Sequence, residues 1–239
     1  MAAVEDEMWF YRALHAHLER HLIAARGEST SRVLDAGCGT GGLIRRLAVR
    51  HPNWTWTGID LEPLACDLAR ARCRAEIVPG SVPALPWAEA SFDAVVSADV
   101  LYHLDDDRAA LRECHRVLRP GGTLVINVPA HRWLWSYHDV TVHGRRRYVR
   151  SEIAAKLHEA GFRSIQTTHW NTLPLPLILA RRKLLPPPES GSDVRLYPAP
   201  VEALLRGAMA VERGWMRAFG ALPVGSSLLA VGVKPDEPR

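Results

Sequence analysis

The sequence predicts an α/β fold: a doubly wound, mostly parallel sheet of seven strands, with a helical insertion before the last strand. Runs of β-forming residues alternate with helical patterns from residue 32 to about 168, which is typical of parallel sheets. The first run, 33–36, leads into a glycine-rich turn over 37–42 that opens a helix. Glycine permits positive φ and close approach of backbone to a ligand, so this turn is a candidate binding site.

The first helix is expected over 5–26, because Trp9, Leu14 and Leu18 fall near one face. His17 and His21 are four residues apart on it, but no third ligand is nearby, so we expect solvated or internally satisfied histidines and no metal site. Pro63 suits the first turn of a later helix, where its missing N–H costs nothing. The further helices are expected over 43–50, 63–74, 106–118, 151–160 and 200–219.

The strands are read from β-branched and aromatic runs bounded by turn residues. The run 92–98 is almost continuously apolar, which indicates a strand buried on both faces. Gly161 suits a helix cap before a further strand. The seven strands are expected over 32–36, 54–60, 75–78, 92–98, 123–128, 162–168 and 227–233.

Composition is that of an ordinary globular protein, with 239 residues, 47% hydrophobic and 23% charged. The net charge of +4 is modest and does not favour a nucleic-acid partner. Four cysteines without a CxxC pair read as reduced thiols, and the acidic N-terminus is unlike a leader, so we expect a cytoplasmic protein. No run is long enough for a transmembrane helix, although 173–185 is compatible with contact at a membrane surface.

Polar residues follow several of the predicted strands, and the carboxyl ends of parallel strands meet at one sheet edge, where ligands bind. These residues are Asp35, Asp60, Ser81, Asp99 and Pro129. A helix N-terminus after the glycine turn favours a carboxylate or phosphate. Gly37, Gly39 and Gly42 also fit the dinucleotide pattern GxGxxG, with Asp60 near the distance of its ribose-binding acid. An NAD-dependent oxidoreductase is therefore an alternative interpretation.

Two segments do not follow the alternation of strands and helices. Residues 129–150 have no periodicity but are rich in histidine, arginine and aromatic side chains, as in a functional loop. Residues 170–225 contain an apolar stretch broken by prolines, a polar segment at 189–193 and the last predicted helix. We interpret this insertion as a lid or a partner surface.

Five motifs, in order and at the usual distances, resemble those of class I S-adenosylmethionine-dependent methyltransferases. They are VLDAGCGTGG (33–42), GID (58–60), GSVPALPW (80–87), SFDAVVSADVLYHLDDD (91–107) and LRPGGTLVINVP (118–129). Trp9-Phe10, a VPAHxWLWSxxD segment (128–139) and RRRY (145–148) are similar to a bacterial type-11-like subgroup. The resemblance covers 32–168 and 227–233 and implies one domain over 1–239 with a Rossmann-like core, an N-terminal helix and the 170–225 lid.

The resemblance implies S-adenosyl-L-methionine as cofactor and S-adenosyl-L-homocysteine as product. Asp35 then suits the ammonium group, Asp60 the two ribose hydroxyls, and Ser81 the adenine amino group, where many relatives carry an acid. An N-cap is the alternative role for Asp60. The expected cofactor-binding residues are Asp35, Gly37, Cys38, Gly39, Gly41, Asp60, Leu61, Ser81, Val82, Asp99 and Val100.

Methyl transfer is an in-line displacement, and a hydroxyl acceptor also needs a base, for which histidine is the usual choice. His103, expected to open the helix beside the pocket, is the first candidate; His131 and His138 are alternatives. We expect a hydrophobic or lipid-like small-molecule acceptor and O-methylation rather than N- or C-methylation. The residues expected to bind it are Trp133, Tyr137, Asp139, His143, Arg146 and Tyr148. His143-Gly144 stands where the subgroup usually has Gly-His, and a catalytically silent relative that acts through 170–225 is a further alternative.

Overall fold

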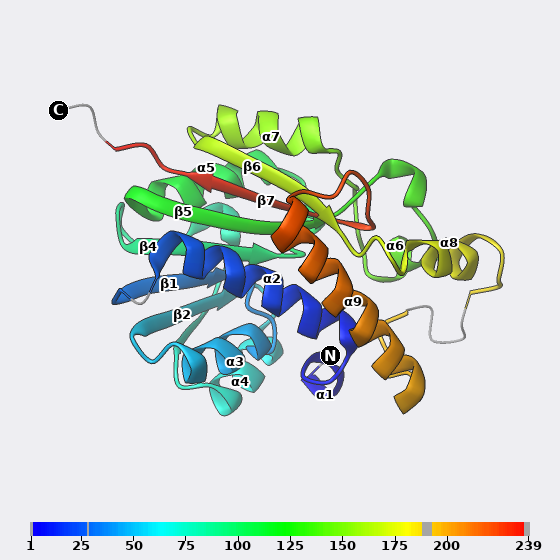
Figure 1. Cartoon of the computed structure of the whole chain (residues 1–239). Helices are drawn as coiled ribbons and strands as arrows, with labels where there is room; N and C mark the ends of the chain where they lie inside the picture. Colours follow the sequence, from blue (N-terminus) through cyan, green and yellow to red (C-terminus); the bar gives the residue numbers. More distant parts are fainter. Residues whose placement is uncertain (1, 28, 188–192, 237–239) are drawn as a thin grey trace.

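The structure, a computed structural model, describes residues 2–27, 29–187 and 193–236. Its sheet has seven strands in the order β3-β2-β1-β4-β5-β7-β6 (Figure 1). They are β1 (Ser31–Ala36), β2 (Trp54–Asp60), β3 (Glu76–Pro79), β4 (Phe92–Ala98), β5 (Leu118–Pro129), β6 (Arg163–Trp170) and β7 (Ser227–Val233). β7 runs antiparallel to both β5 and β6, and the first five strands are parallel to one another. The predicted fold class is confirmed.

Helices cover both faces of the sheet (Figure 1). In the described parts they are α1 (Ala2–Glu5), α2 (Trp9–Arg26), α3 (Gly42–Arg50), α4 (Pro63–Arg72), α5 (Asp107–Val117), α6 (Tyr137–Thr141), α7 (Arg150–Glu159), α8 (Leu175–Lys183) and α9 (Ala199–Phe219). Short 3-10 turns are η1 (Val82–Ala84), η2 (Leu101–His103) and η3 (Arg132–Leu134). Successive residues of a strand face opposite layers: Val33 belongs to the buried cluster that includes residues of α2, α3 and α9, and Leu34 to the one that includes residues of α5 and α7.

Most boundaries agree with the sequence-based ones to within two residues, and the larger differences are at the first helix and at β5. The helix expected over 5–26 is divided, and α2 begins at Trp9. The backbone N–H of Trp9 donates to the Glu202 carboxylate at 2.8 Å. β5 begins at Leu118, which pairs with Phe92 before a register shift, rather than at 123. Most of the polar segment expected at 189–193 lies outside the described residues.

The sheet positions the candidate site by gathering the ends of β1, β2 and β4 at one edge. Asp35, Asp60 and Asp99 lie at those ends. Figure 1 shows α6 and α8 beyond this edge, while α2 and α9 cross one face of the sheet side by side. Residues from both 129–150 and 170–225 therefore lie beyond the end of the sheet that carries the three carboxylates.

Candidate cofactor and acceptor site

The glycine turn begins directly after β1, and its first two N–H groups anchor it to the neighbouring strand. Gly37 and Cys38 donate to the carbonyl of Ile59 at 2.8 and 2.9 Å. Gly37 has φ +94°, and a Cβ there would lie 2.1 Å from Val100. Gly39 has φ +52°, and a Cβ there would meet no atom within 4 Å. Gly37 is thus required by packing, whereas Gly39 borders open space in which a ligand could approach the backbone.

The Asp60 carboxylate fixes the geometry of this turn. Its Oδ2 accepts the N–H of Gly39 at 2.8 Å and its Oδ1 accepts the N–H of Glu62 at 3.0 Å. The helix-capping role considered for Asp60 belongs instead to Glu62, which accepts from Leu64 at the start of α4. Each carboxylate oxygen has a second lone pair, so both could still accept a hydroxyl. Leu61 beside it is 73% exposed and offers an apolar surface.

The Asp35 carboxyl lies almost wholly inside the protein, with 2% of the residue exposed. Burial, together with the negative charges of Glu5 and Asp60, raises its pKa to about 8. A buried acid with raised pKa beside like charges gains from a cationic partner, because a cation favours its ionised form.

Asp99 ends β4 with an unusual backbone conformation for a residue other than glycine, φ +54°. Its N–H donates to the carbonyl of Asn127, and the Asn127 side chain donates back to its Oδ1 at 2.9 Å. The Asn127 amide oxygen in turn accepts the indole N–H of Trp170 at 2.7 Å. Burial raises the pKa of Asp99 to about 7 against the lowering effects of Asn127 and of the Arg147 charge. Two successive hydrogen bonds, from Trp170 of β6 to Asn127 and from Asn127 to Asp99, therefore orient the Asp99 carboxyl.

The N-terminal segment reaches the start of α3, a contact between residues distant in the sequence. Glu5 is buried, and a Cβ on Gly42 would lie 2.2 Å from its carboxyl carbon. Its carboxylate accepts from the Thr40 hydroxyl at 2.5 Å and from Arg72 at 3.1 Å. The sequence predicts a carboxylate or phosphate at the N-terminus of this helix, and the protein's own Glu5 carboxylate lies there.

The polar edge of the sheet is consequently acidic. Four carboxyl groups act on it, from Glu5, Asp35, Asp60 and Asp99. Two tyrosines, Tyr11 and Tyr102, lie near Asp99, whose charge contributes to raising the pKa of each after burial. Such a set attracts a cation and disfavours a pyrophosphate, so the electrostatics oppose the dinucleotide interpretation.

The adenine-side candidates follow β3. Ser81 is partly exposed and begins η1, with its carbonyl accepting the N–H of Ala84 at 3.0 Å. Val82 is buried and packs in the core beneath. The N–H of Gly80 donates to the carbonyl of Asp60, which keeps this loop beside the ribose candidate.

The three candidate histidines are not gathered at one place. His103 ends η2 instead of opening α5, which begins at Asp107, so the expected position was wrong by one turn. Its Nδ1 lies 3.2 Å from the carbonyl of His143 and its ring lies against Tyr102. Burial lowers its pKa, while that hydrogen bond and the Asp60 charge oppose the change. His103 is thus near enough to Asp60 to feel its charge.

The other two histidines interact with different groups. The His131 ring stacks on His169, with centroids 4.7 Å apart. Burial and the charge of Arg182 lower the pKa of His138 to about 4, and its Nδ1 accepts the N–H of Asp193 at 3.4 Å.

Several side chains expected to bind the acceptor instead hold the 129–150 loop to the protein. Asp139 and Arg147 are both buried and form a two-point ion pair at 2.7 and 3.1 Å. Tyr148 has no exposed surface, and its hydroxyl donates to Asp107 at 2.7 Å. Arg146 donates to the carbonyls of Leu104 and Asp105. We therefore do not propose acceptor contacts for Asp139, Arg146 or Tyr148, because their polar atoms are used inside the protein.

The remaining acceptor candidates differ in exposure. Trp133 is 53% exposed and His143 is also exposed, whereas the Tyr137 hydroxyl donates to Asp193 at 2.8 Å. Within the described ranges, no group of three or more His, Cys, Asp or Glu residues could hold a metal ion. No helix in those ranges is long and apolar enough to cross a membrane.

Comparisons with known proteins bear on the chemistry of this edge. A methyltransferase domain family model matches residues 34–126. The O-methyltransferase rstn1 of Aspergillus nomiae is 31% identical over 169 residues, which are 65% of this chain and 73% of that protein. A demethylmenaquinone methyltransferase of Thermotoga maritima is 38% identical over 122 residues, and the chain spans 50% of its length.

Solved structures agree on the fold. The YcgJ protein of Bacillus subtilis superposes with a TM-score of 0.63 at 19% identity, over 93% of this chain and 100% of that one. The family match, residues 34–126 of this chain, includes the glycine turn, β2, β3 and β4 and most of β1 and β5. The chain belongs to the class I S-adenosylmethionine-dependent methyltransferases, and S-adenosylmethionine is its cofactor.

Proposed function

We propose that this enzyme methylates a hydroxyl group of a hydrophobic small molecule and that residues 1–239 act as a single domain. O-methyltransferases among the relatives, including rstn1 and a malonyl-[acyl-carrier protein] O-methyltransferase of Erwinia pyrifoliae, support the acceptor atom. Exposed apolar side chains in and around α8, at Leu173, Leu177 and Leu184, support a hydrophobic acceptor. The four free cysteines are consistent with a cytoplasmic location.

The acidic edge fits the cofactor, which carries an ammonium and a sulfonium. Asp35 would hold the ammonium, the Gly39 backbone would lie along the methionine and ribose part, and Asp60 would accept from the ribose hydroxyls. Leu61 would pack on the adenine, with Ser81 as acceptor for its amino group. When bound, the cofactor supplies a methyl group whose bond to sulfur breaks as the bond to the acceptor oxygen forms.

The single observation that carries the choice of base is the hydrogen bond of His103 to the carbonyl of His143: with Nδ1 donating at 3.2 Å, Nε2 is left as the acceptor. Burial lowers the pKa of His103, and the charge of Asp60 opposes that change. A neutral imidazole can accept the proton that the acceptor hydroxyl loses. Asp99, with a pKa of about 7, is a second group able to take that proton.

The test compares His103→Gln with His131→Gln, using labelled S-adenosylmethionine and the hydrophobic fraction of a cell extract. His103→Gln should lower turnover by about a hundredfold, at the low end of what general bases contribute. Affinity for S-adenosylhomocysteine, measured by calorimetry, should be unchanged. His131→Gln should retain turnover, since His131 stacks on His169.

The product of the same reaction decides the acceptor atom. Mass spectrometry should place the new methyl group on an oxygen. A methylated nitrogen or carbon would overturn O-methylation, and full turnover by His103→Gln would move the role of base to Asp99.

A further inference from the structure

The glycine turn is held at two neighbouring points of its backbone. Asp60 accepts the N–H of Gly39 at 2.8 Å. The guanidinium of Arg72, the last residue of α4, donates to the carbonyl of Thr40 at 3.0 Å. These contacts use the first and the last polar group of the Gly39–Thr40 dipeptide. Two side chains from outside the turn therefore fix the backbone along which we place the cofactor.

Arg72 and the end of α4 contact the turn in further ways. Nη1 of Arg72 also donates to the Thr40 hydroxyl at 2.8 Å. Gly41 has φ +79°, and a Cβ there would lie 3.0 Å from the Ala69 side chain and 3.2 Å from the Cys73 sulfur. The end of α4 is thus packed closely against the turn, so a movement of Arg72 would move the Thr40 backbone with it.

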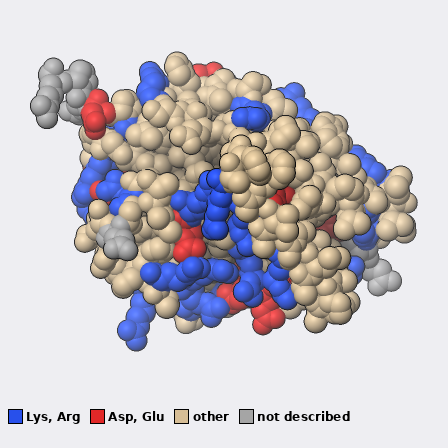
Figure 2. Space-filling model, viewed as in Figure 1, with Lys and Arg blue, Asp and Glu red and all other residues tan. Residues whose placement is uncertain are grey.

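Two carboxylates of the N-terminal segment fix the Arg72 side chain. Its Nη1 donates to Glu5 at 3.1 Å, and its Nη2 donates to Asp6 at 2.8 Å. Asp6 also pairs with Arg45 of α3 at 2.6 Å. Figure 2 shows positive and negative side chains side by side where α1 lies next to α3, so the charges of this contact offset one another. A planar guanidinium that bonds through both terminal nitrogens is held in one orientation.

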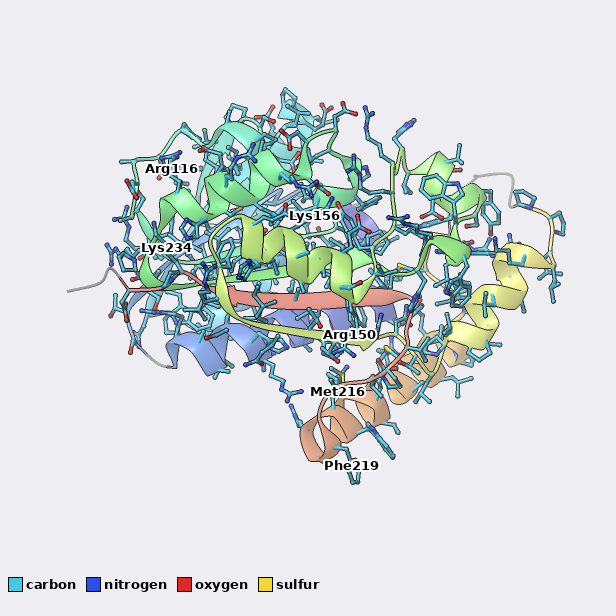
Figure 3. The ribbon with its side chains drawn as sticks, turned by 90° about the horizontal axis from the view of Figure 1, so that it is seen from above. Arg116, Arg150, Lys156, Met216, Phe219 and Lys234 are labelled. Carbon is cyan, nitrogen blue, oxygen red and sulfur yellow. The ribbon has the colours of Figure 1, made fainter. Side chains whose placement is uncertain are left out.

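The N-terminal segment is itself anchored to the protein just after these two acids. Met8 and Trp9 are buried, and the N–H of Trp9 donates to the Glu202 carboxylate of α9 at 2.8 Å. Figure 3 shows α2 and α9 on the same side of the sheet, with Met216 directed from α9 toward the body of the protein. The two acids that hold Arg72 therefore precede a helix whose start is fixed.

We propose that Arg72 is a positioning residue for cofactor binding, which fixes the Thr40 end of the dipeptide as Asp60 fixes the Gly39 end. Both terminal nitrogens of Arg72 are used by Thr40, Glu5 and Asp6, so it acts through the backbone of the turn and not by contact with the cofactor. Glycine-rich backbone has many accessible conformations, and the contact at Thr40 selects one of them. The proposal rests on the placement of the cofactor along this turn.

The same helix offers a matched control in Arg70. Its Nε and Nη2 donate to the carbonyl of Ile77 at 3.2 and 2.8 Å, and its Nη1 pairs with Asp67 at 2.7 Å. Like Arg72, it binds a main-chain carbonyl and an acid, but the carbonyl belongs to β3 and not to the glycine turn. Arg70→Gln therefore removes a charge and a main-chain contact from α4 without freeing Thr40.

The test is calorimetric titration of the whole protein with S-adenosylhomocysteine, at a temperature well below the melting temperature of every variant. Arg72→Gln should weaken the affinity by about tenfold, within the range for a residue that acts on a ligand without touching it. Arg70→Gln should bind as the wild type even where it melts earlier. Arg72→Lys keeps the charge but not the planar fork, so it should lose an intermediate amount of affinity. It also serves as the test variant if Arg72→Gln does not fold.

A double-mutant cycle with Asp60→Ala separates positioning from a general loss of stability. Because both side chains hold the same dipeptide, Arg72→Gln should cost less affinity in the Asp60→Ala background than in the wild type. Additive losses, or equal affinities of Arg72→Gln and Arg70→Gln, would overturn the role of Arg72 while a weakened Asp60→Ala keeps the cofactor at the turn. Wild-type affinity in both Asp60→Ala and Arg72→Gln would overturn the placement of the cofactor as well.

Discussion

The two halves of the candidate site use their charged groups in opposite ways. At the glycine turn, Asp60 accepts from the backbone N–H groups of Gly39 and Glu62, which are neutral donors. In the 129–150 loop, Asp139 is neutralised by Arg147 inside the protein. A carboxylate held by neutral donors can attract a cation, whereas one held by an arginine cannot. The first half is built to bind a ligand and the second to hold a loop in place.

The 129–150 loop also shows that a segment rich in functional side chains does not necessarily have them free to bind a ligand. Residues 145–148 place three arginines and a tyrosine together in the sequence. In the structure these side chains diverge: Arg145 pairs with Asp105, Arg146 with main-chain carbonyls, Arg147 with Asp139, and Tyr148 with Asp107. The many charged and polar side chains of this segment therefore serve to hold the loop to the rest of the protein.

The largest expected effect comes from breaking the buried pair in this loop. Arg147→Gln should lower the free energy of unfolding by about 3–5 kcal/mol, because it leaves the Asp139 carboxylate buried without its counter-charge. Arg145→Gln, two residues away, removes an exposed ion pair with Asp105 and should cost about 0–1 kcal/mol. Urea denaturation measures both.

Turnover in the same variants distinguishes a structural loop from an acceptor site. Arg145→Gln should retain turnover if the arginines serve only the fold. Loss of turnover in a fully stable Arg145→Gln protein would mean that the loop binds the acceptor through its charges, and the contrast between the two halves would fail.

The sequence predicted the fold well because its signals are local. The glycine turn, the apolar run 92–98 and the helix stop at Gly161 each depend on neighbours in the chain, and the structure has them where expected. The convergence of Asp35 and Asp60 follows from the parallel order of strands alone.

The unpredicted features depend on partners distant in the sequence. The Glu5 carboxylate accepts from the Thr40 hydroxyl and from Arg72 beside the start of α3, and Asn127 links Asp99 to Trp170 of β6. The sequence predicts a substrate contact for Tyr148, because no neighbouring residue indicates that its hydroxyl donates to Asp107. Periodicity states which face of an element is buried, but it does not state which polar groups meet there.

The next largest effect is expected at the other half of the site. Asp60→Ala should weaken S-adenosylhomocysteine binding by about tenfold to a hundredfold, since a hydrogen bond to a charged group contributes about 1.5–3 kcal/mol. Asp67→Asn, on the exposed side of α4, is the matched loss of one negative charge and should leave the affinity unchanged. Isothermal calorimetry gives both values. Equal affinities in wild type and Asp60→Ala would show that the carboxylate serves only Gly39 and Glu62.

The smallest expected effect is a dependence on pH that distinguishes an acidic cofactor site from a merely buried acid. The pKa of Asp35 is raised to about 8 by burial and that of Asp99 to about 7, so the folded protein holds protons that the unfolded chain releases near pH 4. Stability without cofactor should therefore be greatest at the acidic end of this window and fall as pH rises toward 8.

Cofactor affinity should change in the opposite direction, because the ammonium group requires the ionised form of Asp35. Affinity for S-adenosylhomocysteine should rise with pH between 6 and 8, by at most about tenfold per pH unit. Asp35→Asn should flatten both dependences relative to the Asp67→Asn control, with thermal melting and calorimetry as the two readouts. If affinity and stability instead fell together with rising pH, the Asp35 carboxyl would act on the fold alone, and the acidic edge would have to hold the ammonium through Asp60 or Asp99.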